Sequence, residues 1–174
     1  MIFKGNVGMT MIKASEYVLS DSIDVNFGST SEYNEWIGVG AGESDIALGS
    51  TGWTATVDGT GNGNAGYWPG PYPDTVCDTY IYHSSILNLS IEGLDDAAIY
   101  QFDILLCRES ITERLNEVTV AGGTPQIIDV DDNTTLLYFT NVSPTSGAIA
   151  ITSEINSEAS YCYFNAMVIR EYTQ

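Results

Sequence analysis

The stretch LNLSIEGLDDAAIYQFDILLC, residues 87–107, carries the two patterns that decide the fold. Its first five residues alternate apolar and polar side chains, as in a β-strand with one buried face, and Gly93 follows shortly after. Residues 98–107 are mostly apolar, which indicates a strand covered on both faces. Two such strands in succession predict sheets packed against one another.

The same strand signals recur on both sides of this stretch, with turn residues about every 8 to 12 positions. The segments concerned are 23–27, 53–57, 76–82, 118–120, 127–130, 136–142, 149–151 and 161–169. Residues 110–118 are interpreted as a turn leading into a strand, with a one-turn helix as the alternative. We therefore expect an all-β fold, an antiparallel β-sandwich or jelly roll of about ten strands.

The length of 174 residues suits one domain. We assign residues 16–174 to a single β-sandwich domain and residues 1–15, which contain both lysines, to an N-terminal arm or first strand. The first residues lack the apolar run of a secretory signal, so we expect synthesis in the cytoplasm without a signal peptide. No apolar stretch is long enough to predict insertion into a membrane.

The chain is strongly acidic, with 23 Asp and Glu against five Lys and Arg and a net charge of −18. This charge disfavours binding to nucleic acid and to anionic lipid. It suits calcium or a basic partner, and a solvated acidic face without a specific partner is the alternative. Cys77, Cys107 and Cys162 lack zinc-ligand spacing and are expected in the core, with a Cys107–Cys162 disulfide as the alternative.

Residues 38–73 are rich in glycine and are expected to form a long excursion from the sandwich. Aromatic rings held by prolines suit stacking against sugars or contact with a protein partner, although they can also cap the core. The candidate carbohydrate- or partner-binding residues are Tyr67, Trp68, Tyr72, Trp53 and Trp36.

The carboxylates around residue 131 form a candidate calcium site. Asp129, Asp131 and Asp132 place oxygen ligands on a tight turn, and Glu43 with Asp45 offer an alternative site. Asx residues also build such turns unaided.

No catalytic residue is assigned. His83 is the only histidine and is expected to form hydrogen bonds at a strand end, so an enzyme is not expected. Arg108 and Arg114 are expected to make buried or half-buried bidentate pairs with carboxylates, with contact to a ligand as the alternative.

Several motifs in the second half resemble galactose-binding-like β-sandwich domains of bacterial surface proteins and bacteriophage structural proteins. These are residues 94–108, Asn141-Val-Ser-Pro144, Gly147-Ala-Ile-Ala-Ile151 and Asn165-Ala-Met-Val-Ile169. The resemblance covers residues 20–172 and implies a carbohydrate-binding or virion-surface module. The first hypothesis is a non-enzymatic structural or decoration component of a virion surface that contacts other virion proteins or itself. The alternative is a carbohydrate-binding module for host-cell glycans.

Overall fold

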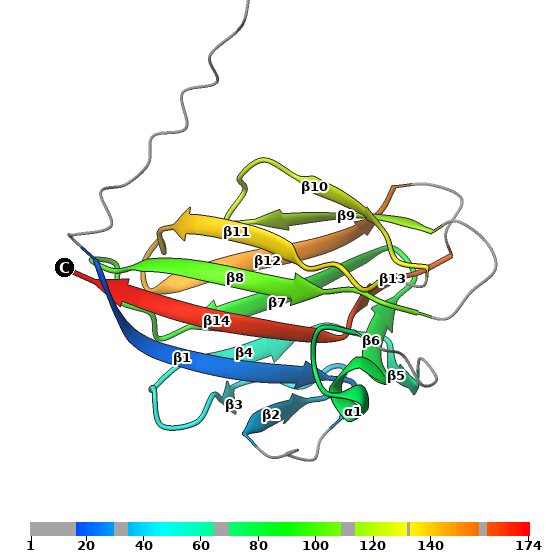
Figure 1. The fold of residues 1–174 in the computed structure, drawn as a ribbon, viewed down its shortest axis with the longest axis horizontal. Helices are drawn as coiled ribbons and strands as arrows, with labels where there is room; N and C mark the ends of the chain where they lie inside the picture. Colours follow the sequence, from blue (N-terminus) through cyan, green and yellow to red (C-terminus); the bar gives the residue numbers. More distant parts are fainter. Residues whose placement is uncertain (1–16, 30–34, 65–69, 109–113, 132, 157–159) are drawn as a thin grey trace, which may run out of the picture.

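The computed structural model is a β-sandwich with fourteen strands and one short helix in the part of the chain that it describes (Figure 1). The described residues are 17–29, 35–64, 70–108, 114–131, 133–156 and 160–174. This result confirms the expected all-β sandwich. The expected N-terminal arm, residues 1–15, lies outside the described residues.

One layer is a five-stranded sheet that contains β1 (Val18–Phe27) near its edge. Its strand order is β11 (Leu137–Val142), β8 (Ile99–Leu105), β14 (Ala166–Thr173), β1 and β2 (Trp36–Val39). Neighbours are antiparallel except β1 and β2, which run parallel with Val25 opposite Ile37. This pair is the one parallel pairing among the described strands of an otherwise antiparallel sandwich.

The other layer is a six-stranded antiparallel sheet, and a three-stranded antiparallel sheet lies at one end of the sandwich (Figure 1). The six-stranded order is β10 (Gln126–Asp129), β9 (Leu115–Val120), β12 (Ala148–Ile155), β7 (Ile86–Glu92), β4 (Thr54–Val57) and β3 (Ile46–Ala47). The small sheet has the order β13 (Cys162–Phe164), β6 (Thr79–His83) and β5 (Gly61–Asn64).

Strand β8 shows why residues 98–107 are almost continuously apolar. Its side chains at Phe102 and Ile104 belong to the core cluster between the two large sheets. Leu105 and Cys107 point to the opposite face and belong to a second buried cluster. Both faces of the strand are therefore covered at this end, as the sequence predicted.

The second cluster is closed by helix α1 (Asp74–Cys77), which the sequence did not predict. The helix begins after Pro73 and has Asp74 in its first turn, where a carboxylate is favoured. Val76 and Cys77 then pack over the outer face of the five-stranded sheet. The strand expected over residues 76–82 therefore begins only at Thr79, because Val76 lies in helix α1 and packs in the second buried cluster.

Gly28 brings the end of β1 against the small sheet. Its φ is +89°, and a Cβ at this position would lie 2.4 Å from the backbone oxygen of Tyr80. Only glycine fits this close approach in a left-handed conformation. The contact fixes β6 beside β1 and so places the small sheet on the end of the sandwich.

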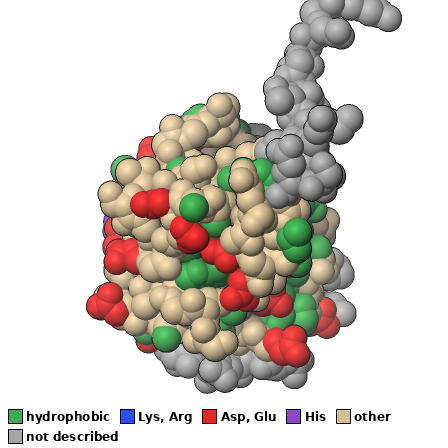
Figure 2. All heavy atoms as spheres, turned by 90° about the vertical axis from the view of Figure 1, so that its left-hand side faces the viewer, with side chains coloured by type: hydrophobic (Ala, Val, Ile, Leu, Met, Phe, Trp, Pro, Cys, Tyr) green, Lys and Arg blue, Asp and Glu red, His purple; other side chains and the backbone are tan. Residues whose placement is uncertain are grey.

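Acidic side chains cover the end of the sandwich opposite the small sheet (Figure 2). On this face Asp and Glu side chains lie among hydrophobic ones, and no Lys or Arg side chain is visible. Within the described ranges, no helix has the length and apolar character needed to cross a membrane.

Candidate ligand-binding pocket

The small sheet carries a row of tyrosines on one face. Tyr80 and Tyr82 lie two residues apart on β6, so their side chains point the same way. Tyr163 on β13 pairs with Tyr82, and Tyr161 directly precedes β13 with the same two-residue spacing. These four tyrosines therefore form a continuous aromatic surface, named here the tyrosine face.

Two glycines of β5 make room for the tyrosine face. Gly61 pairs with Tyr82 and Gly63 pairs with Tyr80 across the strands. A Cβ at Gly61 would lie 2.8 Å from the Tyr82 hydroxyl, and a Cβ at Gly63 would lie 2.4 Å from Tyr80 ring carbons. The Tyr80 and Tyr82 rings therefore lie across β5, which requires residues without side chains at both positions.

Edge-to-face ring contacts hold the tyrosine face together. Tyr80 lies 5.3 Å from Tyr163 with an interplanar angle of 88°, and Tyr82 lies 5.2 Å from Tyr161 at 78°. Tyr163 is 1% exposed and Tyr80 6%, whereas Tyr161 is 37% exposed. The tyrosine face therefore has a buried inner end at Tyr80 and Tyr163 and an exposed outer end at Tyr161.

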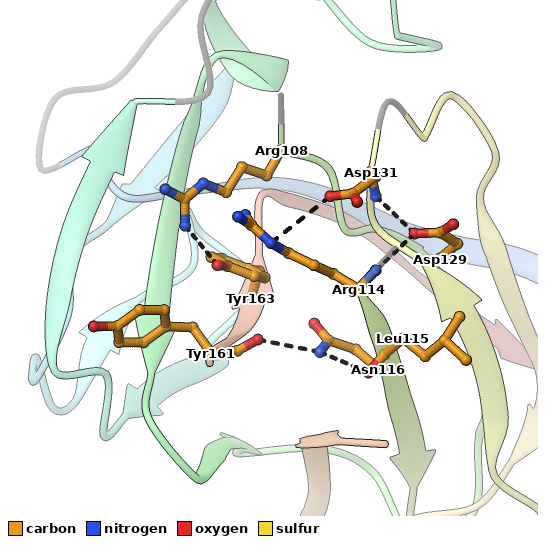
Figure 3. A network of polar contacts seen from close by, with 8 residues as sticks. All are labelled: Arg108, Arg114, Leu115, Asn116, Asp129, Asp131, Tyr161 and Tyr163. Atoms are coloured by element: carbon orange, nitrogen blue, oxygen red, sulfur yellow. Dashed lines mark hydrogen bonds and ion pairs between the residues drawn. The ribbon is translucent and has the colours of Figure 1, made fainter. Parts of the chain in front are cut away.

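Arg108 reaches the inner end of the tyrosine face from the segment that follows β8 (Figure 3). Its Nη1 donates a hydrogen bond of 2.6 Å to the Tyr163 hydroxyl, and its guanidinium carbon lies 5.5 Å from the Tyr163 ring and 5.7 Å from the Tyr80 ring. The backbone fixes the position, because the Arg108 amide donates to the Val130 carbonyl at 2.9 Å. The side chain is thus held by a hydrogen bond and two cation–π contacts.

The electrostatic setting keeps Arg108 charged. Burial opposes its charged form, but the Tyr163 hydrogen bond, the neighbouring tyrosines and Asp131 together raise the Arg108 pKa above its ordinary value. Burial also raises the pKa of Tyr80, with Arg108 acting in the opposite direction, so the hydroxyl is protonated near neutral pH.

These side chains line a cavity of about 300 Å³. The lining consists of Asn62, Gly63, Tyr80, Tyr82, Arg108 and Tyr161. Ligand pockets begin at about this volume, and they combine apolar walls with a few polar groups that orient the ligand. Aromatic faces, phenolic hydroxyls, a guanidinium and an amide can together receive a small ligand that has both apolar and polar surfaces.

A polar network behind the pocket fixes its lining (Figure 3). Arg114 Nε lies 3.9 Å from Asp131 Oδ1, and the Arg114 amide donates to Asp129 Oδ1 at 3.2 Å. Asn116 Nδ2 donates to the Tyr161 carbonyl at 3.3 Å and ties this tyrosine to β9. Arg114 therefore has a carboxylate partner, but through a single contact of 3.9 Å and not the expected bidentate pair. Arg108 instead contacts tyrosines and makes no ion pair within the described ranges.

The predicted calcium ligands are placed only in part. Asp129 Oδ1 accepts a hydrogen bond from the Asp131 amide at 3.1 Å, the geometry of an Asx turn, and Asp132 lies outside the described residues. At the alternative site, Glu43 Oε2 accepts from the Gly40 amide at 2.6 Å. Within the described part of the chain, no three His, Cys, Asp or Glu side chains group as metal ligands, so calcium binding stays a prediction.

The aromatic residues predicted to bind a ligand or partner do not form one exposed surface in the described structure. Trp53 is 4% exposed and contacts Tyr100 in the core, so it is a core residue. Trp36 is 7% exposed and packs 4.8 Å from Tyr72 over the outer face of the five-stranded sheet. Each tryptophan therefore fills a hydrophobic cluster, in agreement with the alternative that such rings cap the core, and a binding role for either one stays a prediction.

Of the three remaining aromatic residues in the predicted set, Tyr72 is the one that the structure describes. Tyr72 is half-buried, its hydroxyl donates to the Asp103 carbonyl at 3.2 Å, and burial raises its pKa. Tyr67 and Trp68 lie outside the described residues. The Tyr72 side chain therefore packs against the outer face of the five-stranded sheet. A binding role for Tyr67 and Trp68 remains a prediction.

The cysteines and the histidine have structural positions. Cys77, Cys107 and Cys162 are buried and are not joined by a disulfide, so the alternative of a Cys107–Cys162 disulfide is wrong. His83 ends β6, and its Nδ1 lies 3.1 Å from both the amide and the hydroxyl of Ser85. This confirms the expected hydrogen-bonding role of His83 at a strand end.

A wider cavity of about 500 Å³ lies where the edge strands β10 and β11 meet. Gln126 Nε2 bridges the two sheets there by donating to the Tyr138 carbonyl at 2.8 Å. Tyr138 is 55% exposed and Ile127 on β10 is 56% exposed. This cavity is wider and more open than the tyrosine pocket.

No protein-family model and no curated protein matches this sequence. Solved structures do match its fold. The structure is similar to the Bacillus subtilis protein YxiM, with a TM-score of 0.58 and 15% identity over 87% of this chain and 40% of that one. It is similar to the Bacteroides uniformis β-glucuronidase, with a TM-score of 0.59 and 14% identity over 85% and 17% of the two chains.

A third similarity is to the ANX2 ectodomain of Arabidopsis thaliana, with a TM-score of 0.59 and 12% identity over 87% of this chain and 50% of that one. This chain thus spans half or less of each of these three structures. At such low identity the likeness concerns the fold alone. This chain is accordingly an all-β sandwich of a kind found within larger proteins of bacteria and plants.

Proposed function

We propose that this chain is a non-enzymatic binding domain of the galactose-binding-like type, and that its tyrosine pocket takes a carbohydrate. The observation that carries the proposal is the convergence of Tyr82, Tyr161, Arg108 and Asn62 on one cavity of about 300 Å³. A sugar ring offers an apolar face of C–H groups and an edge of hydroxyls. Tyrosine rings complement the former, and the hydroxyl, guanidinium and amide groups complement the latter.

The composition of the pocket favours binding over catalysis. Glycoside cleavage ordinarily uses two carboxyl groups on either side of the scissile bond. The described lining of the pocket contains no Asp, Glu or His. Tyrosines and a charged guanidinium bind and orient a sugar without supplying the acid and base that hydrolysis needs.

A glycan array tests the proposal with a matched pair of variants. Tyr161→Ala removes the exposed ring of the pocket, and Tyr138→Ala removes an exposed ring from the β11 edge. We expect the wild type and Tyr138→Ala to bind the same glycans and Tyr161→Ala to lose them, since stacking is lost only in the last. Binding that is abolished by Tyr138→Ala, or an array without any bound glycan, would contradict the proposal.

A role as a structural component of a bacteriophage virion surface is the second candidate. The observation that favours it is the open edge formed by β10 and β11, where Ile127 and Tyr138 are more than half exposed. Exposed apolar side chains on edge strands suit contact with a second chain, either another virion protein or a copy of this one.

Light scattering on the full chain tests this second candidate. An oligomer that dissociates when Ile127→Lys is introduced would support assembly through this edge. A monomer at all concentrations would argue against self-assembly through it. The two candidates are compatible, because a virion-surface protein can also bind glycans.

A further inference from the structure

We infer that the tyrosine pocket selects an acidic sugar, one whose carboxylate is received by the Arg108 guanidinium. The inference rests on the proposed carbohydrate-binding function and names the ligand class for the same pocket.

Positive charge is scarce and is placed unevenly. The part of the chain that the structure describes contains three cationic side chains of Lys or Arg, namely Arg108, Arg114 and Arg170. Two of them lie beside the pocket, while the opposite end of the sandwich displays carboxylates (Figures 2 and 3). The chain has a net charge of −18, so the cavity beside these two arginines is the described region best suited to bind an anion.

The three arginines also differ in their partners. Arg170 Nη1 lies 2.5 Å from Asp103 Oδ2, and Arg114 Nε lies 3.9 Å from Asp131 Oδ1. Among the described residues, Arg108 makes no ion pair with a carboxylate and instead contacts the Tyr163 hydroxyl and two tyrosine ring faces. Asp131 makes its ion pair with Arg114 and acts on Arg108 without such a pair, so the Arg108 guanidinium can still bind an anion in the pocket.

The geometry of Arg108 suits a carboxylate. A guanidinium has five N–H donors, and Nη1 uses one of them on Tyr163. Arg108 also belongs to the described lining of the cavity. The ring contacts hold its plane in place, so a two-pronged hydrogen bond to a carboxylate needs little further ordering. A sugar that stacks on Tyr161 or Tyr82 would present its carboxylate to this group.

The test compares sugars that differ in one group. Calorimetric titrations use the methyl glycosides of glucuronic acid and galacturonic acid, each against its neutral counterpart with a hydroxymethyl group in place of the carboxylate. Hydrogen bonds to a charged partner predict about 10- to 100-fold tighter binding of one acidic sugar than of its neutral partner. Arg108→Gln should abolish that preference, so that the variant binds the acidic sugar no more tightly than its neutral partner.

Arg108→Lys is the second variant, because it keeps the charge and removes the planar fork. It should retain a smaller preference for the acidic sugar, and thermal unfolding shows whether either variant still folds. Equal binding of both sugars by the wild type would overturn the inference, as would a preference that survives in folded Arg108→Gln. The failure of all four sugars to bind would overturn it too. The glycan array decides separately whether any carbohydrate binds, so the two proposals fail by different results.

Discussion

Replacing Gly63 with alanine tests the packing of the tyrosine face. The added Cβ would lie 2.4 Å from two ring carbons of Tyr80, whereas ordinary contact begins at 3.4 Å, so the ring must move by about 1 Å (3.4 − 2.4). That movement disturbs the contacts of Tyr80 with Tyr163 and Arg108. Overpacking of this kind costs about 1–3 kcal/mol, partly offset by roughly 0.5–1 kcal/mol because alanine suits a strand better than glycine.

We therefore expect Gly63→Ala to lower the free energy of unfolding by about 1–2 kcal/mol, seen in denaturant titration. The melting temperature should fall by roughly 2–4 °C for each kcal/mol in a chain of this size. Carbohydrate binding should weaken as well, since Tyr80 lines the pocket.

A double-mutant cycle isolates the clash from any general effect on β5. Tyr80→Leu removes the ring atoms that the new Cβ would meet. In this background, Gly63→Ala should be neutral or stabilising by up to about 1 kcal/mol. The reasoning is refuted if Gly63→Ala is harmless in the wild type, or if it costs as much in the Tyr80→Leu background.

Three further predictions concern the core and the surface. Tyr100→Phe should lower the free energy of unfolding by about 1–3 kcal/mol in denaturant titration, because the buried Tyr100 hydroxyl donates to Glu171 Oε1 at 2.5 Å; an unchanged stability would contradict this. Burial raises the pKa of Asp24, so the stability that its protonated form contributes is present at low pH and lost as the pH rises through that raised pKa. Asp24→Asn should therefore stabilise the protein near pH 7 and have less effect near pH 3, and a larger gain at the lower pH would argue against it. Burial raises the pKa of the Cys162 thiol to about 11, so thiol reagents at about pH 8 should label it only as the protein unfolds, and rapid labelling of the native chain would contradict its placement.

The fold was largely predictable because each main strand has a recognisable pattern of apolar and polar residues in the sequence. Residues 87–91 alternate and residues 98–107 do not, and the structure explains both by covering one face of β7 and both faces of β8 at its end. The short strands β2, β3 and β5 escaped prediction. β5 has the sequence Gly-Asn-Gly-Asn, a composition with poor strand propensity, and its strand conformation depends on pairing with β6.

The tyrosine pocket was not predicted from the sequence, because tryptophans and prolines give a stronger local signal than tyrosines. Trp36 and Trp53 suggested a binding surface, yet their size made them fillers of hydrophobic clusters. A usable signal existed in the two-residue spacing of Tyr80 with Tyr82, Tyr161 with Tyr163 and Gly61 with Gly63. Each pattern places its residues on one face of a strand, but only the pairing of β13, β6 and β5 brings the three together.

The most direct test of the tyrosine pocket is an amide chemical-shift titration of the isotopically labelled full chain with the glycan that binds best on the array. We expect the largest shifts on residues 61–63, 80–82 and 161–163 and on the Arg108 side chain. We also expect that Tyr161→Ala removes these shifts while residues 126–128 and 137–139 stay unchanged. Shifts concentrated on the β10 and β11 edge, with the tyrosine face unaffected, would contradict a ligand site in the tyrosine pocket and would place binding at that edge.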